Sequence, residues 1–243
     1  MPLVYEVAAG LGQHSLWRPL AVSILFALLA RRLRGVTASG AVAGATICFL
    51  FYAGAGRGAF AVLVVLFMLT SLATRVGYIK KQSLGTAESR EGRTASQVLA
   101  NLGTAALCVV FFCARGTNTL LVAFVAAISE AAADTVSSEI GQSRRQTARL
   151  ITTWRIVPAG TDGGISSWGT FSGFAAAVLI TTTSAAVGLV PWGRIGIPIA
   201  AAVAGMMADS LLGASLERRG WLNNDAVNFL GTCVAVAVAY VLG

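Results

Sequence analysis

The chain of 243 residues is 56% hydrophobic and 12% charged, about half the charged fraction of an ordinary soluble domain. It has no long polar segment, so we expect one integral membrane domain covering residues 1–243. The only histidine, His14, nearly excludes a histidine metal site, a Ser-His-Asp triad and a phosphohistidine carrier. The four cysteines lie within apolar runs and form no CxxC pair, so we interpret them as small hydrophobic residues.

Eight apolar segments have about the length that a helix needs to cross a membrane, roughly 17–25 residues. They are residues 17–31, 37–55, 59–76, 97–114, 117–136, 168–190, 194–214 and 225–242. The first is short, so seven spans is the alternative count. The sequence therefore predicts an all-α, multi-pass transmembrane helical bundle.

Lys and Arg residues gather on alternate sides of these spans. Fourteen of the 18 follow odd-numbered spans: Arg31, Arg32, Arg34, Arg75, Lys80, Lys81, Arg90, Arg93, Arg144, Arg145, Arg149, Arg155, Arg218 and Arg219. The other four are Arg18, Arg57, Arg115 and Arg194. This asymmetry is typical of a cytoplasmic face, so we expect a cytoplasmic (inner) membrane protein with both termini outside and its long loops in the cytoplasm. Topology accounts for the net charge of +8, and no nucleic-acid partner is expected.

The first polar motif, from Arg93 to Asn101, opens the fourth span. Gln97 and Asn101 are four residues apart and therefore share one face of a helix. We expect Arg93 to contact a phosphate, although it could instead serve only as a topology marker.

The second motif runs from Glu130 to Glu139 and ends the fifth span. A spacing of four places Glu130 and Asp134 on one helix face. Carboxylates at membrane depth are costly and indicate function. Hard oxygen ligands of this kind suit Mg²⁺, which proteins often hold with one or two carboxylates plus substrate phosphates. A hydrogen-bonded polar contact between helices is the alternative.

The third motif is a glycine-rich loop that leads directly into a helix. Its candidate phosphate-binding residues are Gly160, Thr161, Asp162, Gly163, Gly164 and Ser166. Glycines let a backbone approach a ligand, and a helix N-terminus offers free N–H groups to an anion. The loop is not a Walker A motif. A simple turn capped by Asp162 or Ser166 is the alternative.

The fourth motif begins at Asp209 and continues to Asn224 and Asn228. Ala208-Asp209-Ser210 resembles Ala133-Asp134-Thr135, and the helix starts that follow the two loops also resemble each other. This similarity predicts repeated helical hairpins, with chance similarity as the alternative. We expect the asparagines to bind a metal-bound phosphate or a base, unless Asn224 is a plain helix cap.

In combination these motifs resemble a known integral membrane family. The shared segments are Arg93 with Gln97-Val98-Leu99-Ala100-Asn101, Ala133-Asp134-Thr135 with Ser138-Glu139, Gly160 to Ser166, Asp209 to Ala214, and Asn224 to Asn228. The family was first described as domain of unknown function ninety-two and includes a plant phytyl-phosphate kinase. The resemblance implies phosphoryl transfer from a nucleoside triphosphate, typically CTP, to an isoprenyl monophosphate such as phytyl, farnesyl or geranylgeranyl phosphate.

These observations assign roles to the candidate residues. The catalytic set is Asp134, Glu139, Asp209 and Arg93, and the Mg²⁺ set is Asp134, Glu139, Asp209 and Asp162. The nucleotide-binding set comprises Gly160, Thr161, Asp162, Gly163, Gly164, Ser166, Gln97, Asn101, Asn224 and Asn228. A secondary transporter and another membrane phosphotransferase stay open as alternatives. The isoprenoid length, the donor base and the oligomeric state also stay open.

The charge asymmetry makes the topology testable. A cysteine introduced near Lys80 or Arg145 should be shielded from a membrane-impermeant thiol reagent in intact cells and should react after lysis. Labelling of either position from outside would contradict the predicted orientation.

Overall fold

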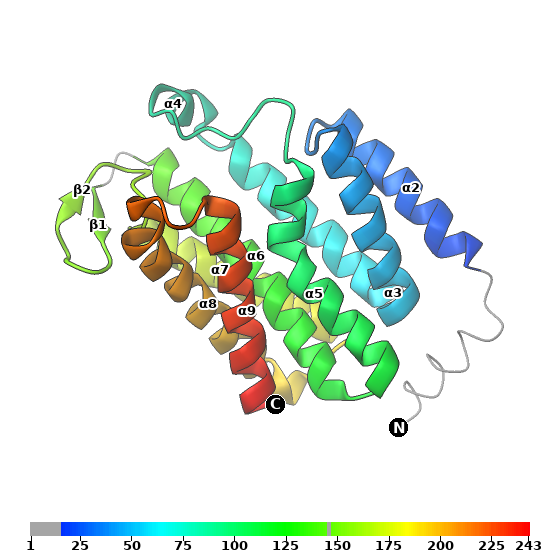
Figure 1. The fold of residues 1–243 in the computed structure, drawn as a ribbon. Coiled ribbons are helices and arrows are strands. Elements are labelled where there is room, and N and C mark those ends of the chain that lie inside the picture. The colour runs from blue at the N-terminus through cyan, green and yellow to red at the C-terminus, as the bar shows by residue number, and fades with distance from the viewer. Residues whose placement is uncertain (1–15, 145–146) are drawn as a thin grey trace.

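The computed structural model describes residues 16–144 and 147–243, so His14 and Arg145 lie outside the described residues (Figure 1). Its helices are α2 (Trp17–Arg32), α3 (Ala38–Arg75), α4 (Tyr78–Ser83), α5 (Ala95–Arg115), α6 (Asn118–Ser143), α7 (Ser167–Ala186), α8 (Gly196–Ser215) and α9 (Asn224–Leu242). Short 3₁₀ turns, Trp192–Arg194 and Glu217–Arg219, flank α8. By length and composition, six of the described helices could cross a membrane. The predicted all-α, multi-pass bundle is confirmed.

The predicted spans 37–55 and 59–76 are the two arms of α3. Gly56 interrupts this helix with φ +80° and ψ −171°, a conformation that is readily accessible only to glycine. Tyr52 and Phe60 stack across the bend with their ring centroids 5.7 Å apart. At the other end, Arg75 donates a hydrogen bond to the Leu33 carbonyl just before α3 begins. The two arms therefore form a hairpin, and both ends of α3 lie at one face of the bundle.

Helix α6 forms the centre of the bundle (Figure 1). All its residues from Leu120 to Ala133 are buried, and it packs against α5, α7, α8 and α9. Helix α2 lies at the edge, where it packs on α3 and exposes several leucines. The core is therefore built around the helix that carries Glu130 and Asp134.

Four helices begin at the same face, each with a capping side chain that accepts a backbone N–H. The caps are Thr37 for α3, Thr94 for α5, Ser166 for α7 and Asn223 for α9. Between α6 and α7 the chain forms a small antiparallel sheet of strands β1 (Ala148–Leu150), β2 (Ile156–Val157) and β3 (Gly164–Ile165), in the order β2-β1-β3. We had expected only a loop here. The sheet holds both ends of the glycine-rich segment in place.

Small residues allow the central helices to approach closely. A Cβ atom added to Gly205 of α8 would lie 2.6 Å from Glu130 Cγ and 2.7 Å from the Gly231 carbonyl oxygen of α9. A Cβ atom on Gly173 of α7 would lie 2.7 Å from the Ala133 carbonyl oxygen. Packing of this kind is typical of helix association in lipid, where van der Waals contact replaces the hydrophobic effect.

We predict that Gly205→Val lowers the free energy of unfolding by about 1–3 kcal/mol, because it overpacks the contact among α6, α8 and α9. The matched control is Gly196→Val on the same helix, where an added Cβ atom meets nothing within 4 Å. The measurement is the thermal unfolding temperature of each purified variant in detergent. Equal unfolding temperatures for the two variants would contradict this packing.

Candidate active site at the basic face

A polar cavity of about 150 Å³ lies at the face where the long loops meet. Its walls are the ends of α6 and α8, the beginning of α9 and the glycine-rich loop. Four of its lining residues are acidic: Asp134, Asp162, Asp209 and Glu217. No Lys or Arg belongs to the described lining. We call this space the acidic cavity, and its charge suits a cation or a cation-bound ligand.

Asp134 of α6 and Asp209 of α8 form the centre of the acidic cavity. Their side chains lie within hydrogen-bonding distance of each other. The side-chain amide of Asn228 faces two acceptors and is therefore oriented with its nitrogen toward them. It donates to Asp209 Oδ2 at 3.2 Å and to the Asn224 carbonyl at 3.3 Å. Two carboxyl groups this close repel each other unless a proton or a cation lies between them. The predicted convergence of the two Ala-Asp segments is therefore present in the fold.

Glu130 lies one helical turn deeper than Asp134. It is 1% exposed, and its Oε1 has no hydrogen-bond partner among the described residues. A Cβ atom added to Gly231 would lie 2.7 Å from this oxygen and 3.3 Å from Asp209 Cβ. Because a buried polar atom without a partner is costly, this oxygen needs a proton or a cation nearby.

The glycine-rich loop packs tightly against protein on its outer side. Gly160 (φ +87°) and Gly163 (φ +71°) occupy left-handed backbone conformations. Added Cβ atoms would lie 2.5 Å from Thr86 Cγ2 and 2.4 Å from the Ala214 Cβ and N atoms, respectively. We had attributed these glycines to the close approach of a phosphate, but the structure also requires them for packing. A branched residue at Gly163 would therefore displace the loop from α8, whether or not a ligand is bound.

Polar backbone and side-chain groups of the loop and the helix starts complete the acidic cavity. Thr161 Oγ1 donates to the Pro158 carbonyl at 2.8 Å, and Ser166 Oγ accepts the Gly169 N–H at 3.1 Å to cap α7. Asn224 and Asn228 line the wall at the first turns of α9, while Asn223 is the cap. The N-termini of α7 and α9 thus both lie at the acidic cavity, where their first N–H groups favour an anion.

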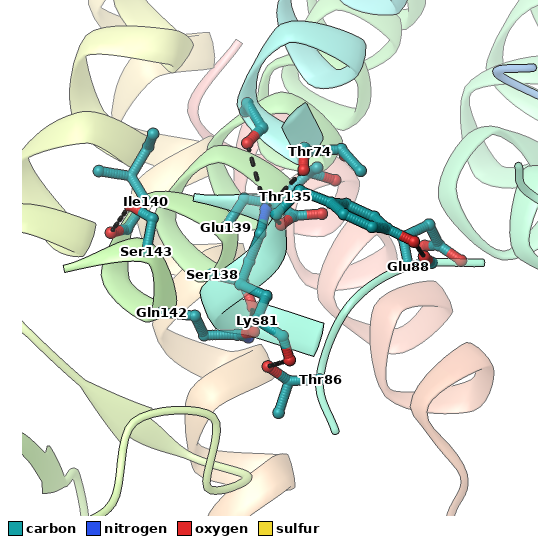
Figure 2. A network of polar contacts seen from close by, with 12 residues as sticks. Thr74, Lys81, Thr86, Glu88, Thr135, Ser138, Glu139, Ile140, Gln142 and Ser143 are labelled. Carbon is teal, nitrogen blue, oxygen red and sulfur yellow. Dashed lines mark hydrogen bonds and ion pairs between the residues drawn. The ribbon is translucent and has the colours of Figure 1, made fainter. Parts of the chain in front are cut away.

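Glu139 lies outside the described lining of the acidic cavity. It forms an ion pair with Lys81, whose side chain is fully buried between α3, α4 and α6 (Figure 2). The Lys81 ammonium also donates to the Thr74 carbonyl at 2.7 Å and to the Ala73 carbonyl at 3.4 Å. We had grouped Glu139 with the metal ligands, whereas the structure gives it a buried cation as partner. From the sequence alone, Lys81 is interpreted only as one of the basic residues of the predicted cytoplasmic face.

Gln97 and Asn101 are also outside the acidic cavity. Gln97 completes a capping box with Thr94 and donates from Nε2 to both carboxylate oxygens of Glu88, at 3.2 and 3.4 Å. Asn101 is buried and donates to the Gln97 carbonyl at 2.9 Å. These amides therefore organise the start of α5, where Arg93 is located.

The backbone of Arg93 is fixed between two segments of the chain. Its N–H donates to the Gly35 carbonyl at 3.1 Å, and its carbonyl accepts the Thr37 N–H at 3.0 Å. Its guanidinium donates to Thr135 Oγ1 at 3.3 Å, next to Asp134. The Arg93 charge is thereby placed beside the central carboxyl pair without occupying the acidic cavity.

The acidic cavity fits a Mg²⁺ ion that is shared with a phosphate ligand. No described group of three or more His, Cys, Asp or Glu side chains is arranged to hold a metal ion without other ligands. Two facing carboxylates, Asp134 and Asp209, match the usual protein contribution to Mg²⁺, which takes its remaining ligands from phosphates and water. Asp162 and Glu217 line the same cavity, and Glu217 was not among the predicted site residues.

Comparison with known proteins identifies the family. The family described as integral membrane protein DUF92 matches residues 21–236. The chain belongs to this family. The resemblance found in the sequence motifs is thereby confirmed.

Proteins from several organisms are similar to this chain. An uncharacterised membrane protein of Synechocystis sp. is 34% identical over 196 residues, covering 78% of this chain and 76% of that protein. One from Methanocaldococcus jannaschii is 35% identical over 222 residues, covering 88% and 90%. Protein VTE6, chloroplastic, of Arabidopsis thaliana is 30% identical over 218 residues, covering 86% and 65%. No solved structure matches the chain significantly.

We predict that the ion pair between Lys81 and Glu139 stabilises the fold. Lys81→Met or Glu139→Gln should each lower the free energy of unfolding by about 3–5 kcal/mol, because each leaves a buried charge without its partner. The double variant Lys81→Met/Glu139→Gln should lose less than the sum of the single losses, because the two single substitutions disrupt the same ion pair. Thermal unfolding of the four proteins measures this coupling. Additive losses would show that the pair is not coupled.

Proposed function

We propose that this protein is a Mg²⁺-dependent membrane kinase. It transfers the γ-phosphoryl group of a nucleoside triphosphate, with CTP as the expected donor, to an isoprenyl monophosphate. The observation that carries the proposal is the acidic cavity, in which facing carboxylates meet two helix N-termini, with the Arg93 guanidinium beside it. Positioning and electrostatic stabilisation of this kind are what phosphoryl transfer requires.

The reaction needs no general base. A phosphate oxygen of the isoprenyl monophosphate is already anionic and attacks the γ-phosphorus of the donor. A new P–O bond forms, the bond between the γ-phosphorus and the β–γ bridging oxygen breaks, and the products are an isoprenyl diphosphate and a nucleoside diphosphate. The single histidine of the chain is therefore no obstacle to this chemistry.

Each group at the site has a distinct role in this proposal. Asp134 and Asp209 hold Mg²⁺, which neutralises phosphate charge when bound. The N-terminus of α7 and the amide of Asn224 contact the donor phosphates. Asn228 orients Asp209 through its hydrogen bond. Arg93, whose guanidinium lies next to Asp134, contacts the phosphates where donor and acceptor meet.

Family membership supports the reaction class. The sequence motifs belong to a family that includes a plant phytyl-phosphate kinase, and one relative of this chain is the chloroplastic protein VTE6. The fold also supports an orientation with the acidic cavity toward the cytoplasm, because the basic loops surround the same face. A lipid substrate explains why such a site is built at the ends of membrane helices.

The position of the carboxyl groups favours a kinase over an ion-coupled transporter. A transporter site is typically near the middle of the bilayer, between the repeats. Here Asp134, Asp162, Asp209 and Glu217 share a cavity with the loops at one face, and among the described carboxyl groups of the central helices only Glu130 lies deeper, by one helical turn. A kinase uses such a site at the membrane surface, where a soluble nucleotide meets a lipid phosphate.

The proposal is tested with purified protein in detergent, a panel of γ-labelled nucleoside triphosphates and isoprenyl monophosphates of different lengths, with and without Mg²⁺. We expect label in the isoprenyl diphosphate, in the presence of Mg²⁺ only. Hydrolysis of the nucleotide without transfer to any lipid phosphate would contradict the proposed reaction.

Asp134→Asn and Asp209→Asn should each reduce turnover at least about 100-fold, because each removes a carboxylate from the metal site. The matched control is Asp225→Asn, a carboxylate in the first turn of α9 that is not part of the described lining. Rates are compared at equal amounts of folded protein, as judged by size-exclusion chromatography. Unchanged turnover in either cavity variant would remove that residue from the mechanism.

A further inference from the structure

A second, larger cavity of about 310 Å³ lies between α2, the two arms of α3 and the beginning of α5. Its inner wall is apolar and includes Phe26, Leu63, Leu66, Phe67 and Leu102. Its outer end is basic and includes Arg34, Arg75, Arg90 and Arg93. We call it the amphiphilic cavity, since one end suits a hydrocarbon chain and the other an anion.

The geometry points to the amphiphilic cavity as the binding site of the acceptor lipid, a monophosphate ester with a long isoprenyl chain. We propose that the arginines at its outer end bind the phosphate while the chain lies between α2 and α3. This inference rests on the proposed kinase function and specifies where its second substrate binds.

The charges at the outer end match a phosphate monoester. None of its four arginines forms an ion pair with a described carboxylate. The acidic residue in the lining, Glu88, is occupied by two contacts from Gln97 Nε2. Guanidinium groups bind phosphate oxygens through several directed N–H donors. An anion is therefore the ligand that this end of the cavity favours, in contrast to the acidic cavity.

Arg93 connects the two cavities. It lines the amphiphilic cavity, while its guanidinium donates to Thr135 Oγ1, next to Asp134. Ala131 also lines the amphiphilic cavity and lies one turn from Asp134 on α6. A phosphate held at Arg93 would thus lie beside the carboxylates that we assign to the metal-bound donor, as transfer between two bound phosphates requires.

The lipid side of the cavity has room for a chain. Gly44 of α3 lines it, and a Cβ atom added there would meet nothing within 4 Å. Its outer wall is α2, the edge helix, with its leucines exposed toward the surroundings. On this side the cavity is thus bounded by an edge helix with an apolar outer surface, which is compatible with a lipid chain as ligand.

Two substitutions test this site. Gly44→Phe fills the apolar part without requiring a left-handed backbone, and Arg34→Gln removes one charge at the outer end. Their matched controls are Val42→Phe, at an exposed position of α3 two residues away, and Arg31→Gln on α2, both outside the described lining. Folding of every variant is verified by its thermal unfolding temperature.

The measurement is equilibrium binding of geranylgeranyl phosphate to protein in nanodiscs, with phosphatidic acid and inorganic phosphate as competitors and with separate titration of Mg²⁺–CTP. We expect Gly44→Phe and Arg34→Gln to weaken lipid phosphate binding about tenfold or more, with Mg²⁺–CTP binding and both controls unchanged. If phosphatidic acid displaces geranylgeranyl phosphate as well as unlabelled geranylgeranyl phosphate does, the cavity binds a general bilayer lipid. If inorganic phosphate displaces it at equal concentration, the apolar wall contributes nothing to binding. Either result overturns the inference.

Turnover measured on the same samples separates this inference from the kinase proposal. If wild-type protein transfers phosphate but Gly44→Phe and Arg34→Gln leave the KM for the lipid unchanged, the acceptor binds elsewhere and the inference fails alone. If the wild type binds the lipid phosphate in this cavity but transfers nothing, the kinase proposal fails and the binding site stands.

Discussion

In the hydrocarbon core of a membrane an unpaired peptide group costs several kcal/mol, so this chain can leave the helical conformation only near the two faces of the bundle. Its two longest connections, residues 76–94 and 144–166, both occur at one of them, together with the shorter connection 216–223. They bring the starts of α5, α7 and α9 and the ends of α6 and α8 together. The polar groups of the proposed site are therefore located within the last three turns of α6 and α8, at the starts of α7 and α9 or in the loops, and Glu130 lies one turn deeper than Asp134.

The same constraint explains why two cavities of opposite charge lie side by side. Carboxylates of α6 and α8 face loop residues, where we propose that a cation-bound donor binds. Arginines between α2, α3 and α5 face an apolar space, where we propose that an anionic lipid binds. Arg93 belongs to the second group by its position and touches the first through Thr135. The Arg93 backbone forms hydrogen bonds with Gly35 and Thr37. The position of Arg93 between the two cavities therefore depends on the turn between α2 and α3.

Much of this arrangement could be predicted from local sequence properties. Hydropathy and segment length predicted the membrane helices. The similar segments around Asp134 and Asp209, each followed by a polar loop, indicated a shared site. The partner of Glu139 could not be predicted, because Lys81 is 58 residues away and is indistinguishable from other loop charges. The packing of Gly163 on Ala214 and the amphiphilic cavity were also hidden, since both depend on contacts between distant segments.

The central claim is that a metal-bound nucleotide and a lipid phosphate meet beside Arg93. It is tested most directly by electron–nuclear double resonance of Mn²⁺ bound to the protein with a non-transferable nucleotide analogue, recorded before and after addition of geranylgeranyl phosphate. The account predicts an additional ³¹P coupling from the lipid phosphate, which Gly44→Phe abolishes without altering the nucleotide couplings. A Mn²⁺–nucleotide spectrum that is unchanged at saturating lipid phosphate would contradict it.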